Sequence, residues 1–517
     1  MSDCTKDCCG VDVEVEQKLD VYVLCAARGV SQQATAVSLV ESLQKQGSGV
    51  AVVLNELMAG DVTDAEKKQL DELAESFHVI EGCCVRSAPE DLIGIFVEHS
   101  RSDNIKSVVV LASPASLPAE LGALVGIDCD SLCVLKGLVG IVDGASFWTT
   151  LQEGSCLADT YGDKFEQVAQ VTPFADMGVS QLLVDSFEDA AGVVVLNSDA
   201  ATVEAVKAVA PREAFVVTSV EAGVEEVLKA ASAMSCCKSE EDCKKQCEDE
   251  QKEEECCQQG ECQEGGSQGI EIDSLMQQSG WLDLIRLAES SDASRTLDEE
   301  DAADVADIAA KRVVAGQHVQ TLVYRRRRPF EPVRLLEALD VLTAADSGVV
   351  RARGYLWLAS HDMAMTMWSQ SGCDVDFMAE QPWWSALPRE EWPFDEPQIV
   401  SKIMADFDGE FGDRRQEICF VVRDLDESML VSLLDSCLLN DEEMALGAEK
   451  WEEKYGDVPF PVKIVTDDDD EDEDDIIDTD NMTPEQQRAL FQAMTEGLTP
   501  EQFAAIKAEF GGDFASE

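Results

Sequence analysis

Arg351-Ala-Arg-Gly-Tyr-Leu-Trp-Leu-Ala359 is the stretch of the chain that tells most about its fold. Its aromatic and aliphatic residues favour a β-strand. Shorter stretches of the same kind occur at residues 321–325, 365–369 and 416–422. Helical patterns occupy residues 332–342 and 427–438. Strands and helices mixed in this way predict a compact α+β domain, to which we assign residues 318–462.

Several short motifs accompany this strand. In chain order they are Val323-Tyr-Arg-Arg-Arg-Arg-Pro-Phe330, the quoted strand, Trp368-Ser369, Trp383-Trp384, Gly412-Asp-Arg-Arg-Gln-Glu417 and Leu434-Asp-Ser-Cys-Leu-Leu439. The series resembles the C-terminal domain of the CobW family of metal-handling GTPases. One departure is Glu331, where relatives usually carry histidine, so the resemblance implies no metal ligand at this position.

The arginines and tryptophans of these motifs have two interpretations each. Trp357, Trp368, Trp383 and Trp384 can be packing residues or the lining of a cofactor site, and we favour packing. The four arginines at residues 325–328 can bind phosphates or pair with nearby carboxylates. In a chain with a net charge of −65, we expect local carboxylate partners and no nucleic-acid binding.

The N-terminal half has a different pattern, in which short apolar runs alternate with helical stretches. The predicted strands are residues 21–25, 50–55, 107–111, 138–142, 192–197 and 214–218. The predicted helices include residues 34–46, 64–76 and 201–209. Apolar strands that alternate with helices indicate a mainly parallel sheet covered on both faces. We assign this α/β domain to residues 18–234, and the resemblance implies a P-loop GTPase domain.

The family's phosphate-binding loop corresponds to the first strand-to-helix turn, Cys25-Ala-Ala-Arg-Gly-Val-Ser-Gln-Gln33. Such a loop binds phosphates with backbone N–H groups and a lysine, and magnesium with a Ser or Thr hydroxyl. Gly29 is retained, but Gln32 stands at the lysine position and Gln33 at the hydroxyl position. Because the positive charge and the metal ligand are missing, the resemblance implies a degenerate site with little or no GTP hydrolysis.

Further nucleotide-site positions follow later strands. Asn55 and Glu56 match family positions, as does Asp143. The guanine-reading motif Asn-Lys-x-Asp corresponds to Asn197-Ser-Asp-Ala200, in which the asparagine is retained and the lysine is lost. Asn55, Glu56 and Asp143 can equally be strand-end residues with capping roles.

The family's metal-transfer motif, Gly-Cys-x-Cys-Cys, corresponds to Gly82-Cys-Cys-Val-Arg86. Cys83 is retained, Cys84 is out of step, and the remaining ligand positions are Val85 and Arg86. Thiolates are preferred zinc ligands, but two adjacent cysteines alone rarely complete a site. Cys83 and Cys84 are therefore either metal ligands or a pair of partly buried thiols.

Residues 235–269 have an abruptly different composition, rich in cysteine and charge and poor in large apolar residues. We interpret them as a mobile insert. Its cysteines are Cys236, Cys237, Cys243, Cys247, Cys256, Cys257 and Cys262. Their short spacing permits thiolate-rich zinc sites or a soft-metal cluster, and relatives often carry a histidine-rich tract in the same place. The alternative is a solvated linker with incidental cysteines.

The remaining segments are assigned from composition and helix-start signals. They are a cysteine-containing tail (1–17), a helical connector (270–317), an acidic disordered linker (463–482) and a helical hairpin (483–517) with two Thr-Pro-Glu-Gln helix starts. No apolar run reaches the length of a membrane span, and the N-terminus lacks the pattern of a signal peptide. We expect a cytoplasmic protein that binds no membrane and keeps its 19 cysteines reduced.

Together these features predict a CobW-like protein of metal homeostasis. It would bind zinc or a similar soft cation and buffer it or deliver it to a client protein. GTP with magnesium is the family's cofactor, and we expect its hydrolysis to be lost here. Two alternatives stay open: an active GTP-dependent zinc chaperone, and a non-enzymatic interaction scaffold.

Overall fold

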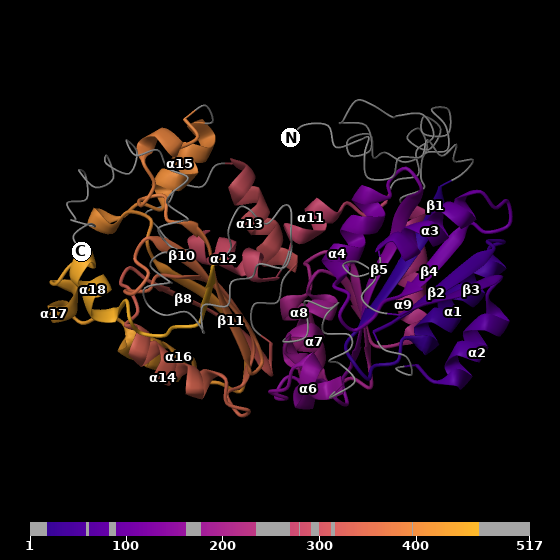
Figure 1. Cartoon of the computed structure of the whole chain (residues 1–517), viewed down its shortest axis with the longest axis horizontal. Helices are drawn as coiled ribbons and strands as arrows, with labels where there is room; N and C mark the ends of the chain where they lie inside the picture. Colours follow the sequence, from indigo (N-terminus) through magenta and orange to yellow (C-terminus); the bar gives the residue numbers. More distant parts are fainter. Residues whose placement is uncertain are drawn as a thin grey trace. The chain divides into compact units, whose positions relative to one another are not determined.

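The computed structural model divides into two compact units (Figure 1). The first comprises Met1–Trp148 and Ser155–Ser279, and the second Thr149–Gly154 and Gly280–Glu517. The residues that the structure describes are 18–57, 62–81, 89–161, 177–233, 269–278, 280–290, 299–311, 316–394 and 397–464. In these ranges no helix combines the length and apolar character needed to cross a membrane.

Seven strands form the sheet of the first unit, in the order β3-β2-β4-β1-β5-β6-β7, and all neighbouring pairs are parallel. They are β1 (Leu19–Ala26), β2 (Val50–Glu56), β3 (Ser76–Glu81), β4 (Ser107–Leu111), β5 (Cys133–Asp143), β6 (Gly192–Leu196) and β7 (Phe215–Val217). Every residue of β2 and β4 is buried, as expected for strands covered on both faces. Because β1 lies between β4 and β5, the strand order reverses at its carboxyl end, where α/β sheets usually bind ligands.

Helices cover both faces of this sheet. One face packs against α1 (Gln33–Lys45), α2 (Asp64–Leu73) and α9 (Val220–Ala233). The other packs against α3 (Pro89–Ser100), α4 (Pro118–Ala123) and α11 (Ile272–Met276). The remaining helices are a π-helix (Leu124–Asp128), α5 (Phe147–Thr150), α6 (Leu157–Tyr161), α7 (Val179–Glu188) and α8 (Ala200–Val209). The predicted parallel α/β domain is thus confirmed.

Strand β3 is the main departure from the sequence prediction in this unit. The expected helix over residues 64–76 ends at Leu73, because Ala74 turns to an extended conformation. The Glu75 carboxylate then accepts a hydrogen bond from the Val50 backbone at 2.7 Å, and Ser76 begins a strand that pairs with β2. Strand β5 also starts earlier than predicted, at Cys133.

The second unit is built on a six-stranded sheet in the order β13-β11-β10-β9-β12-β8. Its strands are β8 (Val319–Arg326), β9 (Val349–Leu356), β10 (Ala364–Ser371), β11 (Asp374–Pro382), β12 (Gln416–Arg423) and β13 (Val462–Ile464). Neighbouring strands are antiparallel except β11 and β13, which are parallel. The sheet and its helices confirm the predicted α+β domain, although β11 and β13 were not predicted.

Helices α14 (Pro332–Leu342) and α16 (Glu427–Cys437) cover one face of this sheet and share its main core. Helix α12 (Gly280–Ser290) packs against Cys419 of β12, and α13 (Glu299–Lys311) lies against α12. A smaller core holds Trp357, Trp383 and Trp451. The other helices are α15 (Pro397–Ala405), α17 (Asp441–Met444), α18 (Ala448–Tyr455) and two 3₁₀ turns (Arg389–Glu391, Gly409–Phe411). The predicted hairpin at residues 483–517 and linker at 463–482 lie outside the described residues, apart from residues 463–464.

The stretch Arg351–Ala359 forms β9 and the turn after it, at the centre of the second sheet. Gly354 has a φ of 150°, and a Cβ atom there would lie 2.1 Å from the Glu417 carbonyl oxygen of β12. A glycine is therefore needed for the close approach of the two strands. Trp357 follows the strand, fully buried, and its backbone N–H donates to the Gln416 side chain at 3.1 Å.

Candidate functional site

The turn between β1 and α1 lies where the strand order reverses. Gly29 has a φ of 77°, and a Cβ atom there would meet nothing within 4 Å. Gln32, at the predicted lysine position, donates from Nε2 to the Ala112 carbonyl oxygen at 2.9 Å, just beyond the end of β4. This uncharged side chain thus connects the turn to the neighbouring strand.

Gln33, at the predicted hydroxyl position, is also occupied by a protein contact. Its Nε2 donates to the Gln69 Oε1 atom of α2 at 2.7 Å. Its backbone N–H faces the Ser31 hydroxyl at 3.3 Å. The two positions therefore present amide groups that are hydrogen-bonded to the protein, with neither an ammonium group nor a hydroxyl.

Asn55 and Glu56 lie at the carboxyl end of β2, and both are buried. Asn55 Oδ1 accepts from the Ser113 backbone at 3.1 Å and from the Ser116 hydroxyl at 3.2 Å. Glu56 pairs with Lys67 of α2 and accepts from the Val62 backbone at 2.9 Å. These contacts agree with the alternative in which both residues serve the ends of strands.

The structure brings Asn197 and Asp143 together at the ends of β6 and β5. Asn197 Nδ2 donates to Asp143 Oδ1 at 3.0 Å, and the Ala145 backbone donates to the same oxygen at 3.2 Å. Asn197 has a φ of 44°, a left-handed conformation that asparagine tolerates better than most residues. The aspartate of the motif, Asp199, caps α8 by accepting from the Thr202 backbone at 2.7 Å.

The predicted metal ligands lie outside the described residues. These are Cys83, Cys84, Cys236, Cys237, Cys243, Cys247, Cys256, Cys257 and Cys262. Among the residues that the structure describes, no three or more His, Cys, Asp or Glu side chains come together in a way that could hold a metal ion. The proposed thiolate sites therefore stay predictions.

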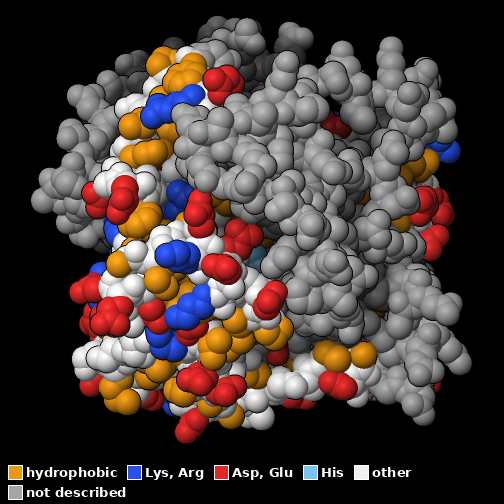
Figure 2. All heavy atoms as spheres, turned by 60° about the vertical axis from the view of Figure 1, so that its left-hand side comes forward, with side chains coloured by type: hydrophobic (Ala, Val, Ile, Leu, Met, Phe, Trp, Pro, Cys, Tyr) orange, Lys and Arg blue, Asp and Glu red, His pale blue; other side chains and the backbone are white. Residues whose placement is uncertain are grey.

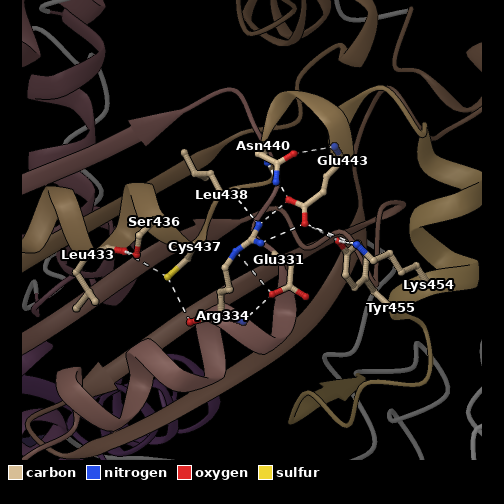
Figure 3. Close-up of polar contacts among 10 residues, drawn as sticks. All are labelled: Glu331, Arg334, Leu433, Ser436, Cys437, Leu438, Asn440, Glu443, Lys454 and Tyr455. Atoms are coloured by element: carbon tan, nitrogen blue, oxygen red, sulfur yellow. Dashed lines mark hydrogen bonds and ion pairs between the residues drawn. The ribbon is translucent and has the colours of Figure 1, made fainter.

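Position 331 lies in a polar cluster of the second unit (Figure 3). Glu331 caps α14, because its carboxylate accepts from the Arg334 backbone N–H at 2.7 Å. The Arg334 guanidinium donates to both carboxylate oxygens of Glu443, at 3.2 and 2.8 Å, and to the Leu438 carbonyl at 2.9 Å. Glu331 is thus part of a network in which Arg334 joins α14 to Glu443 of α17.

Cys437 borders the same cluster (Figure 3). Its thiol lies within hydrogen-bonding distance of the Arg334 and Leu433 carbonyl oxygens, at 3.4 and 3.3 Å. Burial raises the pKa of this thiol. A protonated thiol that donates to carbonyl oxygens is a poor metal ligand, so Cys437 is best explained by packing.

The motif Gly412–Glu417 connects several segments of the second unit. Asp413 accepts from the backbones of Trp384 and Ser385, both at 2.9 Å. Gln416 donates to the Trp357 carbonyl at 2.7 Å, and Arg415 pairs with Glu417 at 2.9 Å. Trp357, Trp368 and Trp383 are fully buried, as expected for packing residues, whereas Trp384 is only partly buried.

Three of the four arginines at residues 325–328 have carboxylate partners, as predicted. Arg325 pairs with Glu417, Arg326 with Asp435 and Arg328 with Asp441, each at 2.7 Å. Arg327 lies 3.4 Å from the Gly412 and Arg414 carbonyl oxygens. Figure 2 shows basic and acidic side chains interspersed among the described residues of one face.

Sequence reasoning gave no role to His78 and His99, which the structure brings into direct contact. Their Nε2 atoms are 2.9 Å apart. His78 was assigned to no element, because β3 was not predicted. The alternation of Ser76, His78 and Ile80 is the signal that could have indicated a strand with one face toward α3.

The fold and these clusters define a protein with a parallel α/β unit followed by an α+β unit. Residues 319–438 match the family model of the cobalamin synthesis protein CobW C-terminal domain. This match confirms, over these residues, the C-terminal domain that the motifs indicated.

Curated relatives match only part of the chain. A zinc-regulated GTPase metalloprotein activator 1 of Dictyostelium discoideum is 31% identical over 134 residues, which cover 26% of this chain and 28% of that protein. A zinc chaperone of Mycobacterium tuberculosis is 32% identical over 151 residues, which cover 28% of this chain and 36% of that protein. The chain thus spans about a third of the length of these relatives.

Solved structures with similarity to the chain include a Zn(II)-bound YjiA GTPase from E. coli, with 12% identity and a TM-score of 0.25 over 82% of this chain and 100% of that one. Another is HypB from Helicobacter pylori in complex with nickel, with 13% identity and a TM-score of 0.25 over 40% of this chain and 83% of that one. Scores this low support no functional comparison.

Proposed function

We propose that the chain is a CobW-like metal-homeostasis protein that binds zinc or a similar soft cation, buffers it or delivers it to a client protein, and no longer hydrolyses GTP. The CobW C-terminal domain supports the family context. The names of two relatives, a zinc-regulated activator and a zinc chaperone, support zinc as the cation.

The loss of GTP hydrolysis is supported above all by the hydrogen bond from Gln32 to the Ala112 carbonyl. Magnesium-bound GTP needs a lysine for its phosphates and a hydroxyl for its metal ion. Gln32 and Gln33 offer neither group, and their amides already bind protein atoms. These residues do not fit the nucleotide, so we assign no reaction step to GTP.

Metal binding is supported by sequence composition. Seven cysteines within residues 235–269 provide the soft ligands that zinc prefers. The many carboxylates around them would attract cations and would also raise thiol pKa values, which weakens metal binding at low pH. Cys83 and Cys84 would add two further thiols, although two adjacent cysteines alone rarely complete a zinc site.

Native mass spectrometry of the reduced protein with added zinc tests this proposal. The full chain should retain zinc stoichiometrically, and a variant that lacks residues 235–269 should lose most of it. A matched control replaces only the lysines of the insert (Lys238, Lys244, Lys245 and Lys252) with Gln and should retain zinc. If neither the full chain nor the control retains zinc, the protein is better explained as an interaction scaffold.

Delivery can be separated from buffering in the same experiment. Adding GTP and magnesium to the zinc-loaded protein should leave the number of bound zinc ions unchanged. GTP-dependent release of zinc would instead support an active GTP-dependent zinc chaperone. A thiol-rich acceptor peptide should remove zinc without any nucleotide.

A further inference from the structure

His78 comes from a strand of the first sheet, and His99 comes from a helix that packs on one face of that sheet. His78 lies in β3, the edge strand, and His99 lies in the last turn of α3. Their Nε2 atoms are 2.9 Å apart, and their rings meet edge to face, with centroids 5.1 Å apart and an interplanar angle of 65°. The two nitrogens therefore converge on one point.

The fold fixes this convergence from both sides. Ser76, His78 and Ile80 alternate along β3 and share a face. Ile80 packs with Leu92 and Phe96 of α3, so the same face of β3 meets that helix. The Ser76 hydroxyl lies 2.9 Å from His78 Nε2 and helps to orient this ring.

Access to the pair is one-sided. His99 is buried, with 4% of its surface exposed, whereas His78 is half-buried on a strand whose outer edge pairs with no other strand among the described residues. An ion could therefore reach the two nitrogens from the side of β3. The carbonyl end of α3, which carries partial negative charge, lies beside His99 and favours a cation there.

The chemical surroundings of His99 also matter for metal binding. Burial and the neighbouring His78 lower the pKa of His99, while the exposed Glu98 on the same helix opposes this change. The neutral imidazole is the form that binds metal ions. Without a metal, a single N–H can lie between the two Nε2 atoms, and a cation would use both lone pairs.

The distance agrees with metal coordination. With metal–nitrogen bonds of about 2.0–2.1 Å, two nitrogens lie roughly 2.9 Å apart at a right angle and roughly 3.3 Å apart at a tetrahedral angle. The 2.9 Å separation in the structure needs an opening of only a few tenths of an ångström to reach the tetrahedral value.

We propose that His78 and His99 form a two-imidazole site for a borderline divalent transition cation such as zinc, with water completing the coordination shell. The site uses none of the cysteines and rests on the geometry of the first unit, independently of the proposed function. With two protein ligands it would be open and exchange its ion readily.

Histidine-selective NMR tests the site, because the chain has only four histidines. Full-length, reduced protein labelled at histidine Cε1 is titrated with zinc, and the His78 and His99 signals are assigned by substitution. Both signals should shift together and saturate at the same zinc concentration, while those of His318 and His361 stay in place. In His78→Gln, the His99 signal should need at least about tenfold more zinc to shift, because one of two ligands is lost.

Controls keep the test decisive. His318→Gln replaces an exposed histidine and should leave the paired shift unchanged. The amide spectrum of His78→Gln should match that of the wild type, which shows that the variant is folded. His78 is replaced rather than His99 because it is only half-buried, so its loss disturbs packing less. Signals of His78 and His99 that stay fixed in millimolar zinc, or a His99 shift that survives in His78→Gln, would overturn the site. Zinc retained by the cysteines in that case would leave the proposed function standing.

Discussion

Individual charged side chains join segments of the second unit that are distant in sequence. Arg334 of α14 donates two hydrogen bonds to Glu443 of α17, and Glu443 also accepts from the Asn440 backbone at 2.9 Å. The Arg334 hydrogen bond is the main reason that the pKa of Glu443 falls to about 2. Its ionised carboxylate is therefore bound more strongly in the folded state than in the unfolded chain.

Replacing Glu443 with Gln tests this carboxylate. We expect the free energy of unfolding of the second unit to fall by about 1–2 kcal/mol at pH 7, because charged hydrogen bonds are lost at a partly exposed site. The contribution is fully present above the ordinary glutamate pKa near 4.5 and is lost as the pH falls toward 2. The difference between wild type and E443Q should therefore shrink between these pH values.

Denaturant unfolding followed by tryptophan fluorescence measures the free energy of unfolding of the second unit, since this unit holds all tryptophans except Trp148. Glu442→Gln is the matched control, because the neighbouring carboxylate is exposed, and it should change stability little. Equal losses in both variants would contradict the role given to Glu443.

Gly354→Ala tests the close contact between β9 and β12. The new Cβ would meet the Glu417 carbonyl in a backbone conformation that favours glycine, so we expect a loss of about 2–4 kcal/mol. Gly94→Ala in α3 is the contrasting change, because a Cβ there meets nothing within 4 Å and alanine is the better helix former. Thermal unfolding of G354A at the wild-type midpoint would contradict the prediction.

The sequence could predict which residues stand at the nucleotide-site positions, but not what they contact. The loss of the lysine at Gln32 is visible in the sequence, whereas its bond to Ala112 depends on the pairing of β1 with β4. The same holds for Asn197 and Asp143, which are 54 residues apart and meet only because β5 and β6 are neighbours. Such contacts need the strand order, which periodicity does not supply.

At the scale of elements, local signals mark helix starts better than helix ends. Thr63 and Glu66 form a capping box at the start of α2, with the Glu66 backbone donating to the Thr63 hydroxyl at 3.3 Å and the Thr63 backbone to the Glu66 carboxylate at 2.9 Å. The end of α2 has no comparable side-chain signal. The helix was predicted too long for this reason, and short strand β3 was missed.

Thr63→Ala should destabilise α2 by about 1 kcal/mol, because removing the Thr63 hydroxyl leaves the Glu66 backbone N–H without its side-chain acceptor. Amide hydrogen exchange of α2, measured by mass spectrometry, should become several-fold faster. Ser42→Ala in the interior of α1 is the control, because the Ser42 hydroxyl only bonds back to the Ser38 carbonyl. Unchanged exchange in α2 of T63A would contradict the role of the cap.

At the scale of the whole molecule, composition and periodicity predicted two sheet-based domains of different type. They predicted the parallel class of the first sheet, since its strands are continuously apolar. They did not predict that residues 149–154 belong to the second unit. One contact that holds this segment there is the hydrogen bond from the Cys373 backbone N–H to the Leu151 carbonyl oxygen, at 3.1 Å. This pairing joins segments more than 200 residues apart.

The net charge of −65 gives a prediction for the molecule as a whole. Repulsion among carboxylates opposes compact states and is screened by salt. Raising sodium chloride from about 0.01 to about 0.15 M should therefore raise the midpoint of thermal unfolding by a few degrees. Sodium sulfate at matched ionic strength separates screening from specific ion effects. A midpoint that falls with added salt would contradict the prediction.

Titration calorimetry with GTP and magnesium tests the central proposal most directly, namely that a chain with a CobW C-terminal domain has no working nucleotide site. The reduced, zinc-loaded full chain should show no tight binding of GTP, and no phosphate release above the protein-free rate, because Gln32 and Gln33 replace the cation and the hydroxyl. Micromolar GTP binding with measurable turnover would contradict the account and identify an active GTPase.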